Sequence, residues 1–202
     1  MPLRALPQLN IEESARLAGR WSWAERRLYE AVGAWASSCT APGVRVYFDA
    51  CSQHHAWRSS MWHARLPGRL VQAYPGPAGP QPPEGLVGPA DDRAEGVLAA
   101  MRALGSDLER VAVYSRAVLP RCSVAYRRWR ASCTPVADRP VARALDLVLA
   151  DLRPDWEEGA SLLVGLLEAP GAPAHGGAPE LAATAVARVE GLMLGEALGP
   201  GA

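Results

Sequence analysis

Lysine is absent from this chain of 202 residues, and asparagine, isoleucine and phenylalanine occur once each, as Asn10, Ile11 and Phe48. Its 21 basic residues are therefore all arginine, and 21 Asp and Glu residues balance them to a net charge of zero. Proteins that bind nucleic acid or anionic membranes through charge carry a basic excess, which this chain lacks. We expect neither a nucleic acid nor a membrane surface among its partners.

The chain also lacks the patterns of a zinc ribbon, a secreted protein and a transmembrane protein. Its four cysteines, Cys39, Cys51, Cys122 and Cys133, include no Cys-x-x-Cys pair. Residues 1–19 contain no apolar signal-peptide core, and no apolar run approaches the roughly 18 residues of a membrane span. A chain of this length can bury one core. We expect a soluble, cytoplasmic protein with reduced thiols.

Helical periodicity dominates the pattern that is present, because β-branched residues are sparse and alternating apolar stretches are rare. Asn10, with Glu13 three residues later, forms a capping-box pattern at the start of the first helix. Kinks are expected at Pro120 and Pro154, which fall inside helical patterns. The sequence predicts an all-α fold with helices over residues 10–39, 42–66, 91–132, 138–168 and 180–198.

Two stretches rich in proline and glycine separate these helices. Residues 67–90 are unusually long for a connection inside a compact domain. Short turns join the other bundle helices, so this long link lets the third helix start at the end opposite to where the second stopped. We predict a four-helix bundle over residues 1–168 with a single crossover between helices two and three. A flexible connector and a short C-terminal helix follow over residues 169–202.

Three stretches carry a family resemblance: "LAGRWSWAERRLYEAVGAW", "FDACSQHHAWRSSMWHARLP" and "DRPVARALDLVLADLRPDWEEGASLL". They resemble the ferritin-like superfamily, in particular the short ferritin-like proteins of actinobacteria. The resemblance implies a bundle with one long crossover. It also implies a place for a di-iron or di-manganese centre, which many members of the superfamily hold.

Several ionisable side chains fall on apolar helix faces when successive residues are placed about 100° apart. Glu25 lies inside the apolar face of the first helix, and His55 lies in the middle of the apolar seam of the second. Asp155 lies at the edge of the seam of the fourth helix, whereas His54 is turned toward a flank. A buried carboxylate or imidazole is costly unless it has a partner. Each can be a hydrogen-bonded core residue, or it can be a catalytic group or metal ligand.

The same faces carry side chains suited to an apolar pocket. Seven tryptophans in a chain with one phenylalanine favour an interior walled by indole rings. The predicted substrate-binding residues are Tyr29, Trp21, Trp62, Tyr126 and Cys51.

A dinuclear ferritin-like centre requires Glu-x-x-His on two helices and a Glu on each of the other two. The chain contains no Glu-x-x-His. Glu25, His55 and Asp155 are too few to hold two metal ions. In the alternative in which metal is present, they would hold one iron or manganese ion, with Cys51 as a further ligand.

Three functions remain open. The working hypothesis is an enzyme without metal or cofactor that binds a hydrophobic small molecule, such as a biosynthetic intermediate, in the bundle interior. His55, Glu25 and Asp155 would be the catalytic acid and base groups of an isomerase, cyclase or lyase. In the second reading the same three side chains are the ligands of an oxidase or oxygenase. In the third they form a buried network in a non-catalytic scaffold, and the last helix with Trp23 or Trp57 forms a homodimer interface.

Overall fold

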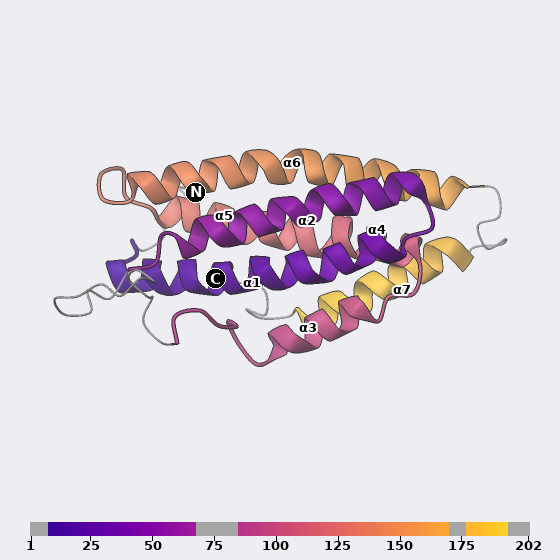
Figure 1. The fold of residues 1–202 in the computed structure, drawn as a ribbon, viewed down its shortest axis with the longest axis horizontal. Coiled ribbons are helices and arrows are strands. Elements are labelled where there is room, and N and C mark those ends of the chain that lie inside the picture. The colour runs from indigo at the N-terminus through magenta and orange to yellow at the C-terminus, as the bar shows by residue number, and fades with distance from the viewer. Residues whose placement is uncertain (1–7, 68–84, 170–176, 194–202) are drawn as a thin grey trace, which may run out of the picture.

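The computed structural model describes residues 8–67, 85–169 and 177–193, and all regular structure in these ranges is helical (Figure 1). The prediction of an all-α fold is confirmed for these residues. A π-helical turn, Tyr114–Val118, joins α4 to α5 in one continuous helix. The helices are α1 (Ile11–Ser38), α2 (Pro42–His63), α3 (Arg93–Arg102), α4 (Asp107–Val113), α5 (Leu119–Ser132), α6 (Arg139–Glu168) and α7 (Gly177–Leu192).

The first helix begins as predicted, with a capping box between Asn10 and Glu13. A tight turn after α1 reverses the chain into α2. The Asp107 carboxylate at the start of α4 accepts hydrogen bonds from the backbone N–H groups of Thr40 (2.9 Å) and Ala41 (2.8 Å), so α2 and α4 start at the same end. The Trp62 ring near the end of α2 packs on Trp129 near the end of α5. The helix α2 and the continuous helix α4–α5 therefore run in the same direction.

The prediction of one continuous third helix over 91–132 is wrong, because the helix is interrupted between Arg102 and Asp107. Ser106 caps the new helix: its hydroxyl accepts from the Glu109 N–H, and the Glu109 carboxylate accepts from the Ser106 N–H. The pattern Gly-Ser-x-x-Glu is both a breaker and a capping box, and these local signals override the apolar periodicity that continues through it.

At Pro120, where a kink is expected, the helix continues and contains a π-helical turn that ends just before the proline. Proline has no N–H to donate to the carbonyl four residues earlier, so the regular ladder cannot continue there. The Leu119 N–H instead donates to the Tyr114 carbonyl, five residues back. The other proline, Pro154, lies inside α6 and does not end it.

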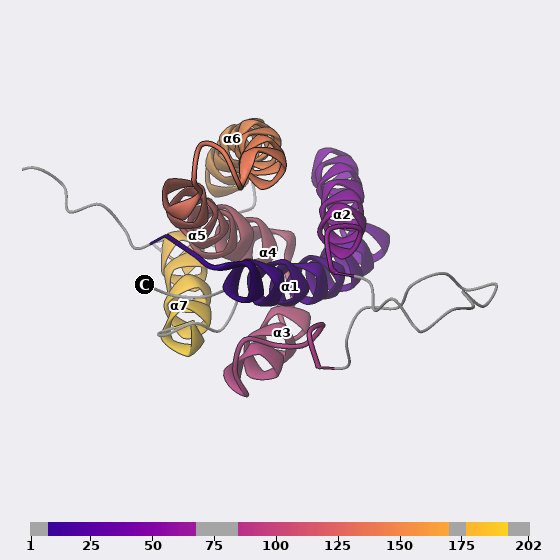
Figure 2. The same ribbon diagram turned by 90° about the vertical axis from the view of Figure 1, so that its left-hand side faces the viewer.

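The helices α3 and α7 form a second layer beside α1 and α4, on the side away from α2 and α6 (Figure 2). Helix α1 is therefore covered on two sides, and Leu28 and Val32 are fully buried. Helix α7 begins earlier than the predicted residue 180, and Val189 on it has no exposed surface. The predicted crossover within 68–84, the connector within 170–176 and the helix end at 194–198 lie outside the described residues.

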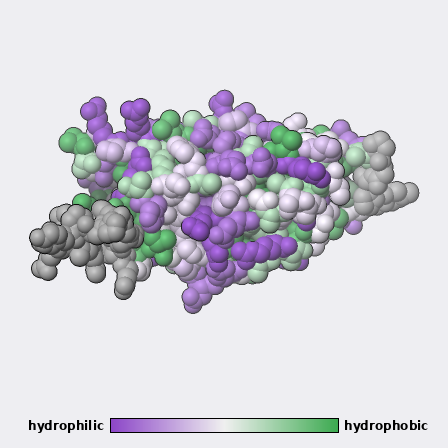
Figure 3. Space-filling view, viewed as in Figure 1, coloured by the Kyte–Doolittle hydropathy of each residue, from purple (hydrophilic) through white to green (hydrophobic). Residues whose placement is uncertain are grey.

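Polar and apolar residues are mixed on the outside of the molecule. On the face in Figure 3, hydrophilic residues predominate and hydrophobic residues form small separate groups. Among the described helices, none is both long enough and apolar enough to cross a membrane.

Candidate functional site

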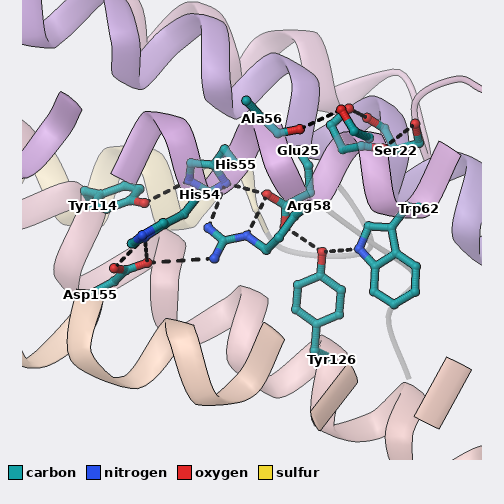
Figure 4. A network of polar contacts seen from close by, with 12 residues as sticks. Ser22, Glu25, His54, His55, Ala56, Arg58, Trp62, Tyr114, Tyr126 and Asp155 are labelled. Carbon is teal, nitrogen blue, oxygen red and sulfur yellow. Dashed lines mark hydrogen bonds and ion pairs between the residues drawn. The ribbon is translucent and has the colours of Figure 1, made fainter. Parts of the chain in front are cut away.

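One network of polar side chains lies at the centre of the molecule, where helices α1, α2, α4–α5 and α6 meet (Figure 4). Glu25, His55 and Arg58 in it have no exposed surface. Helical spacing explains why α2 contributes two members, since residues three apart lie on one face. The network consists of Glu25, His55, Arg58, Tyr114, Tyr126 and Asp155.

The Glu25 carboxylate is the acceptor at the centre of this network. Its Oε2 accepts from His55 Nδ1 and from Arg58 Nε at 3.2 Å, and its Oε1 accepts from the Tyr126 hydroxyl at 2.5 Å. Burial alone would raise the pKa of Glu25, but the Arg58 charge and the His55 and Tyr126 hydrogen bonds hold it at about 2. Glu25 is therefore a carboxylate at neutral pH.

His55 connects this carboxylate to a hydroxyl. Burial lowers the pKa of His55, so the ring is neutral and one nitrogen carries the proton. Because the Glu25 carboxylate can only accept, we assign the proton to Nδ1, so that Nε2 accepts from the Tyr114 hydroxyl at 2.8 Å. The Arg58 Nη2 also lies 3.2 Å from Nδ1, but two donors cannot form a hydrogen bond with each other. Burial raises the pKa of Tyr114 well above its ordinary value and keeps it a donor. A carboxylate, an imidazole and a hydroxyl in this order are the arrangement that activates a nucleophile in hydrolases.

Arg58 brings a permanent positive charge into the site. Burial alone would lower its pKa, but the Glu25 carboxylate raises it above the ordinary value. Its Nη1 lies 3.8 Å from Asp155 Oδ2 and has no hydrogen-bond partner among the described residues. The sequence interpretation missed Arg58, although its position three residues after His55 and four before Trp62, on the same helix face, was a usable signal.

Asp155 joins the network to the surface between α2 and α6. Its carboxyl oxygens lie 2.9 and 3.2 Å from Nδ1 of His54, whose side chain is 43% exposed. The Asp155 backbone carbonyl accepts from the Tyr47 hydroxyl at 2.8 Å. Gly159 leaves the space for that hydroxyl, because a Cβ there would lie 2.3 Å from it. His54 was predicted to lie on a flank, and it is also a partner of Asp155.

The predicted pocket residues Trp21, Trp62 and Tyr126 pack on one another. The rings of Trp21 and Tyr126 are stacked with centroids 4.0 Å apart, and the Trp62 N–H donates to the Tyr126 hydroxyl at 3.1 Å. Cys51 is buried one turn before His55, and burial raises its pKa to about 12, so it is not a reactive thiolate. Tyr29 was expected in the interior, but it is 41% exposed because it lies at the edge of the buried face.

The site does not fit a metal ion. The Arg58 guanidinium lies between Glu25 and Asp155, where it supplies the positive charge that an ion would bring. In the described part of the chain, no three His, Cys, Asp or Glu side chains are grouped so that they could hold a metal. The alternative ligand set of Glu25, His55 and Asp155 is therefore not a coordination site in this structure.

An open hollow of about 340 Å³ lies beside the start of α1 and the ends of α2 and α5. Trp62 belongs both to its wall and to the chain of hydrogen bonds through Tyr126 to Glu25. A second hollow of about 510 Å³ adjoins it between α1 and Leu86. Apolar side chains in the wall of the first hollow are Leu9, Ile11, Ala15, Ala18, Trp62, Pro67, Trp129, Ala137 and Val141.

Comparison of the chain with protein-family models, with curated proteins and with solved structures found no significant match. The resemblance to the ferritin-like superfamily therefore stays a prediction, and the function must be argued from the site.

Proposed function

We propose that this protein is a ferritin-like four-helix bundle that binds a hydrophobic small molecule without a metal. In this proposal the bundle consists of α1, α2, α4–α5 and α6, with the chain between α2 and α4 as its crossover. The ligand occupies the hollow beside Trp62 and Trp129. The observation that carries the proposal is this apolar hollow, which lies next to a centre in which Arg58 supplies the positive charge.

Burial favours the hollow over the network as the binding position. Glu25, His55 and Arg58 have no exposed surface, so a ligand could reach them only after the helices separate. The hollow is already open, and its apolar lining suits an apolar molecule. Trp62 and Trp129 lie behind this lining, because only 0% and 3% of their surfaces are exposed. The network would then hold the four helices in register beneath the binding site.

Binding of the uncharged fluorophore N-phenyl-1-naphthylamine tests this proposal. Its fluorescence should rise on addition of the protein, with saturable binding. Ala15→Trp fills the hollow and should weaken binding at least tenfold, while Ala34→Trp, at an exposed position on the same helix, should leave it unchanged. Absence of binding, or equal binding to both variants, would overturn the proposal, provided that circular dichroism shows both variants folded.

A second candidate is the proton-transfer enzyme, which the alignment of Tyr114, His55 and Glu25 favours. It requires His55 to become accessible during turnover, although its side chain is fully buried in this structure. Diethyl pyrocarbonate, read by mass spectrometry, measures this access. Labelling of His55 at a rate near that of the exposed His63 supports the candidate. Labelling of His63 alone leaves His55 a structural residue.

A non-catalytic scaffold is the outcome if neither test is positive. Its predicted homodimer interface could use Trp57, which is 43% exposed. Trp23 is less suited, because it is partly buried and the Arg27 guanidinium lies over its ring at 5.7 Å.

A further inference from the structure

The outer face of α6 carries apolar side chains that the other described helices leave exposed. Helix α6 packs against α2 and the continuous helix α4–α5, and it lies along one edge of the molecule, so its far side faces solvent (Figures 1 and 2). On that side Leu147 and Val164 are 49% and 48% exposed. The smaller residues between them at helical spacing, Ala150, Pro154 and Ser161, are exposed as well and would let a second helix approach closely.

The charges at the two ends of α6 are placed unfavourably for the helix itself. A helix dipole favours anions at its N-terminus and cations at its C-terminus. Helix α6 instead has Arg139 as its first residue, Arg143 one turn later and Glu168 as its last residue. None of these three forms an ion pair with another described residue. Two further charges on the outer face, Asp146 and Glu157, are already paired with arginines of the same chain.

We propose that the protein forms a homodimer in which α6 packs antiparallel against α6 of a second copy of the chain. This arrangement places the N-terminal end of each helix beside the C-terminal end of the other, so unpaired arginines meet unpaired glutamates and the two dipoles attract. A two-fold axis that crosses α6 just before Trp156 sets Arg143 opposite Glu168 of the partner subunit. The same register sets Leu147 opposite Val164 of the partner subunit, and the symmetry makes each contact occur twice.

Charge reversal, read by sedimentation velocity, tests this register. The parent should dimerise at micromolar concentrations, and Arg143→Glu or Glu168→Arg should each raise the dissociation constant about tenfold or more, because each sets like charges opposite one another at both ends of the interface. The two single variants should pair with each other when mixed, since the glutamates of one chain then face the arginines of the other. The double variant Arg143→Glu/Glu168→Arg should dimerise like the parent. The control Arg128→Glu, at an exposed position on α5, should leave the dissociation constant unchanged.

Loss of fold is distinguishable from loss of the dimer. Both reversals are at exposed positions, so circular dichroism should show the helix content of the parent in each variant. A parent that stays monomeric up to millimolar concentrations would overturn the proposal. A dimer that neither single variant weakens, or single variants that do not pair when mixed, would overturn it too. Fluorophore binding at the hollow is measured separately, so the dimer and the proposed function stand or fall independently.

Discussion

At the scale of single residues, one arginine, Arg58, supplies the positive charge at the centre of the protein. A guanidinium has a permanent charge and a fixed set of donors, so Arg58 can neutralise Glu25 without an exchangeable ligand. Burial of both groups makes the pair sensitive, because removal of either partner leaves an uncompensated charge away from water. We therefore expect the pair to contribute more to how the helices fit together than to net stability.

Arg58→Met should destabilise the protein by about 3–5 kcal/mol, because Glu25 would remain buried without its counter-ion. The double variant Glu25→Gln/Arg58→Met removes both charges and should recover most of that loss. Urea denaturation measures both. The control Arg153→Met, at a surface ion pair, should change the free energy of unfolding by less than about 0.5 kcal/mol. An Arg58→Met protein as stable as the parent would contradict the ion pair.

Acid should destabilise the protein in two ranges of pH. His55 is held neutral when folded, so the unfolded chain binds a proton more readily below its ordinary pKa of 6.5, and stability begins to fall there. Glu25 has a pKa of about 2 when folded and 4.5 ordinarily. Its contribution is complete above pH 4.5 and is lost as the pH falls toward 2, a change of roughly 3 kcal/mol.

Urea midpoints measured from pH 7 to pH 2.5 test this dependence. The double variant Glu25→Gln/Arg58→Met lacks the carboxylate and should lose the decrease below pH 4.5. Parallel curves for the parent and the double variant would show that Glu25 is not the group responsible.

At the scale of the helices, two local irregularities shape the site. The π-helical turn gives the chain one extra residue per turn at Tyr114, whose hydroxyl reaches His55, and such turns occur frequently at functional sites. Gly159 lets α6 approach α2 so closely that the Tyr47 hydroxyl fills the space a Cβ would occupy. The π-helical turn thus contains the residue that contacts α2 through His55, and Gly159 allows the contact between α6 and Tyr47.

Gly159→Ala should destabilise the protein by about 1–3 kcal/mol, because the new methyl group displaces the Tyr47 hydroxyl from the Asp155 carbonyl. Gly165→Ala on the same helix meets no neighbouring atom and should stabilise by roughly 0.5–1 kcal/mol through its higher helix propensity. Thermal unfolding compares the two. Adding Tyr47→Phe to Gly159→Ala should recover part of the loss, and the absence of any recovery would place the strain elsewhere.

At the scale of the whole molecule, helices α3 and α7 cover surface of α1 and α4 that would otherwise be exposed to solvent. Helix α7 packs its buried face, including Ala182, Ala185 and Val189, against α3 and α4. The Arg121 guanidinium also donates to the Met193 carbonyl at 2.7 Å. Helix α7 therefore packs with the other helices as part of one folded unit.

The folded protein should need no metal ion. Chelation should leave its thermal midpoint unchanged, because the positive charge at the centre belongs to Arg58. Mass spectrometric metal analysis of the untagged protein, repeated for Glu25→Ala and His55→Ala, provides the measurement. Near-stoichiometric iron or manganese that is lost in either variant would contradict the proposal and restore the oxidase or oxygenase reading.

The sequence by itself determined the helices and most of the residues they bury. Apolar periodicity is local information, and it was enough to place Glu25, His55 and Asp155 inward. It failed at Gly105–Ser106, where a helix cap acted against the periodic pattern.

Only the tertiary structure decided which of these side chains meet. Pairing depends on how far each helix rotates and slides against its neighbours, and no single helix contains that information. Three features arise only where different helices meet. They are the ion pair of Glu25 with Arg58, the hydrogen bond of His55 with Tyr114 and the hollow beside Trp62. The sequence therefore specified inward-facing charges, whereas the packing decided that an arginine would balance them.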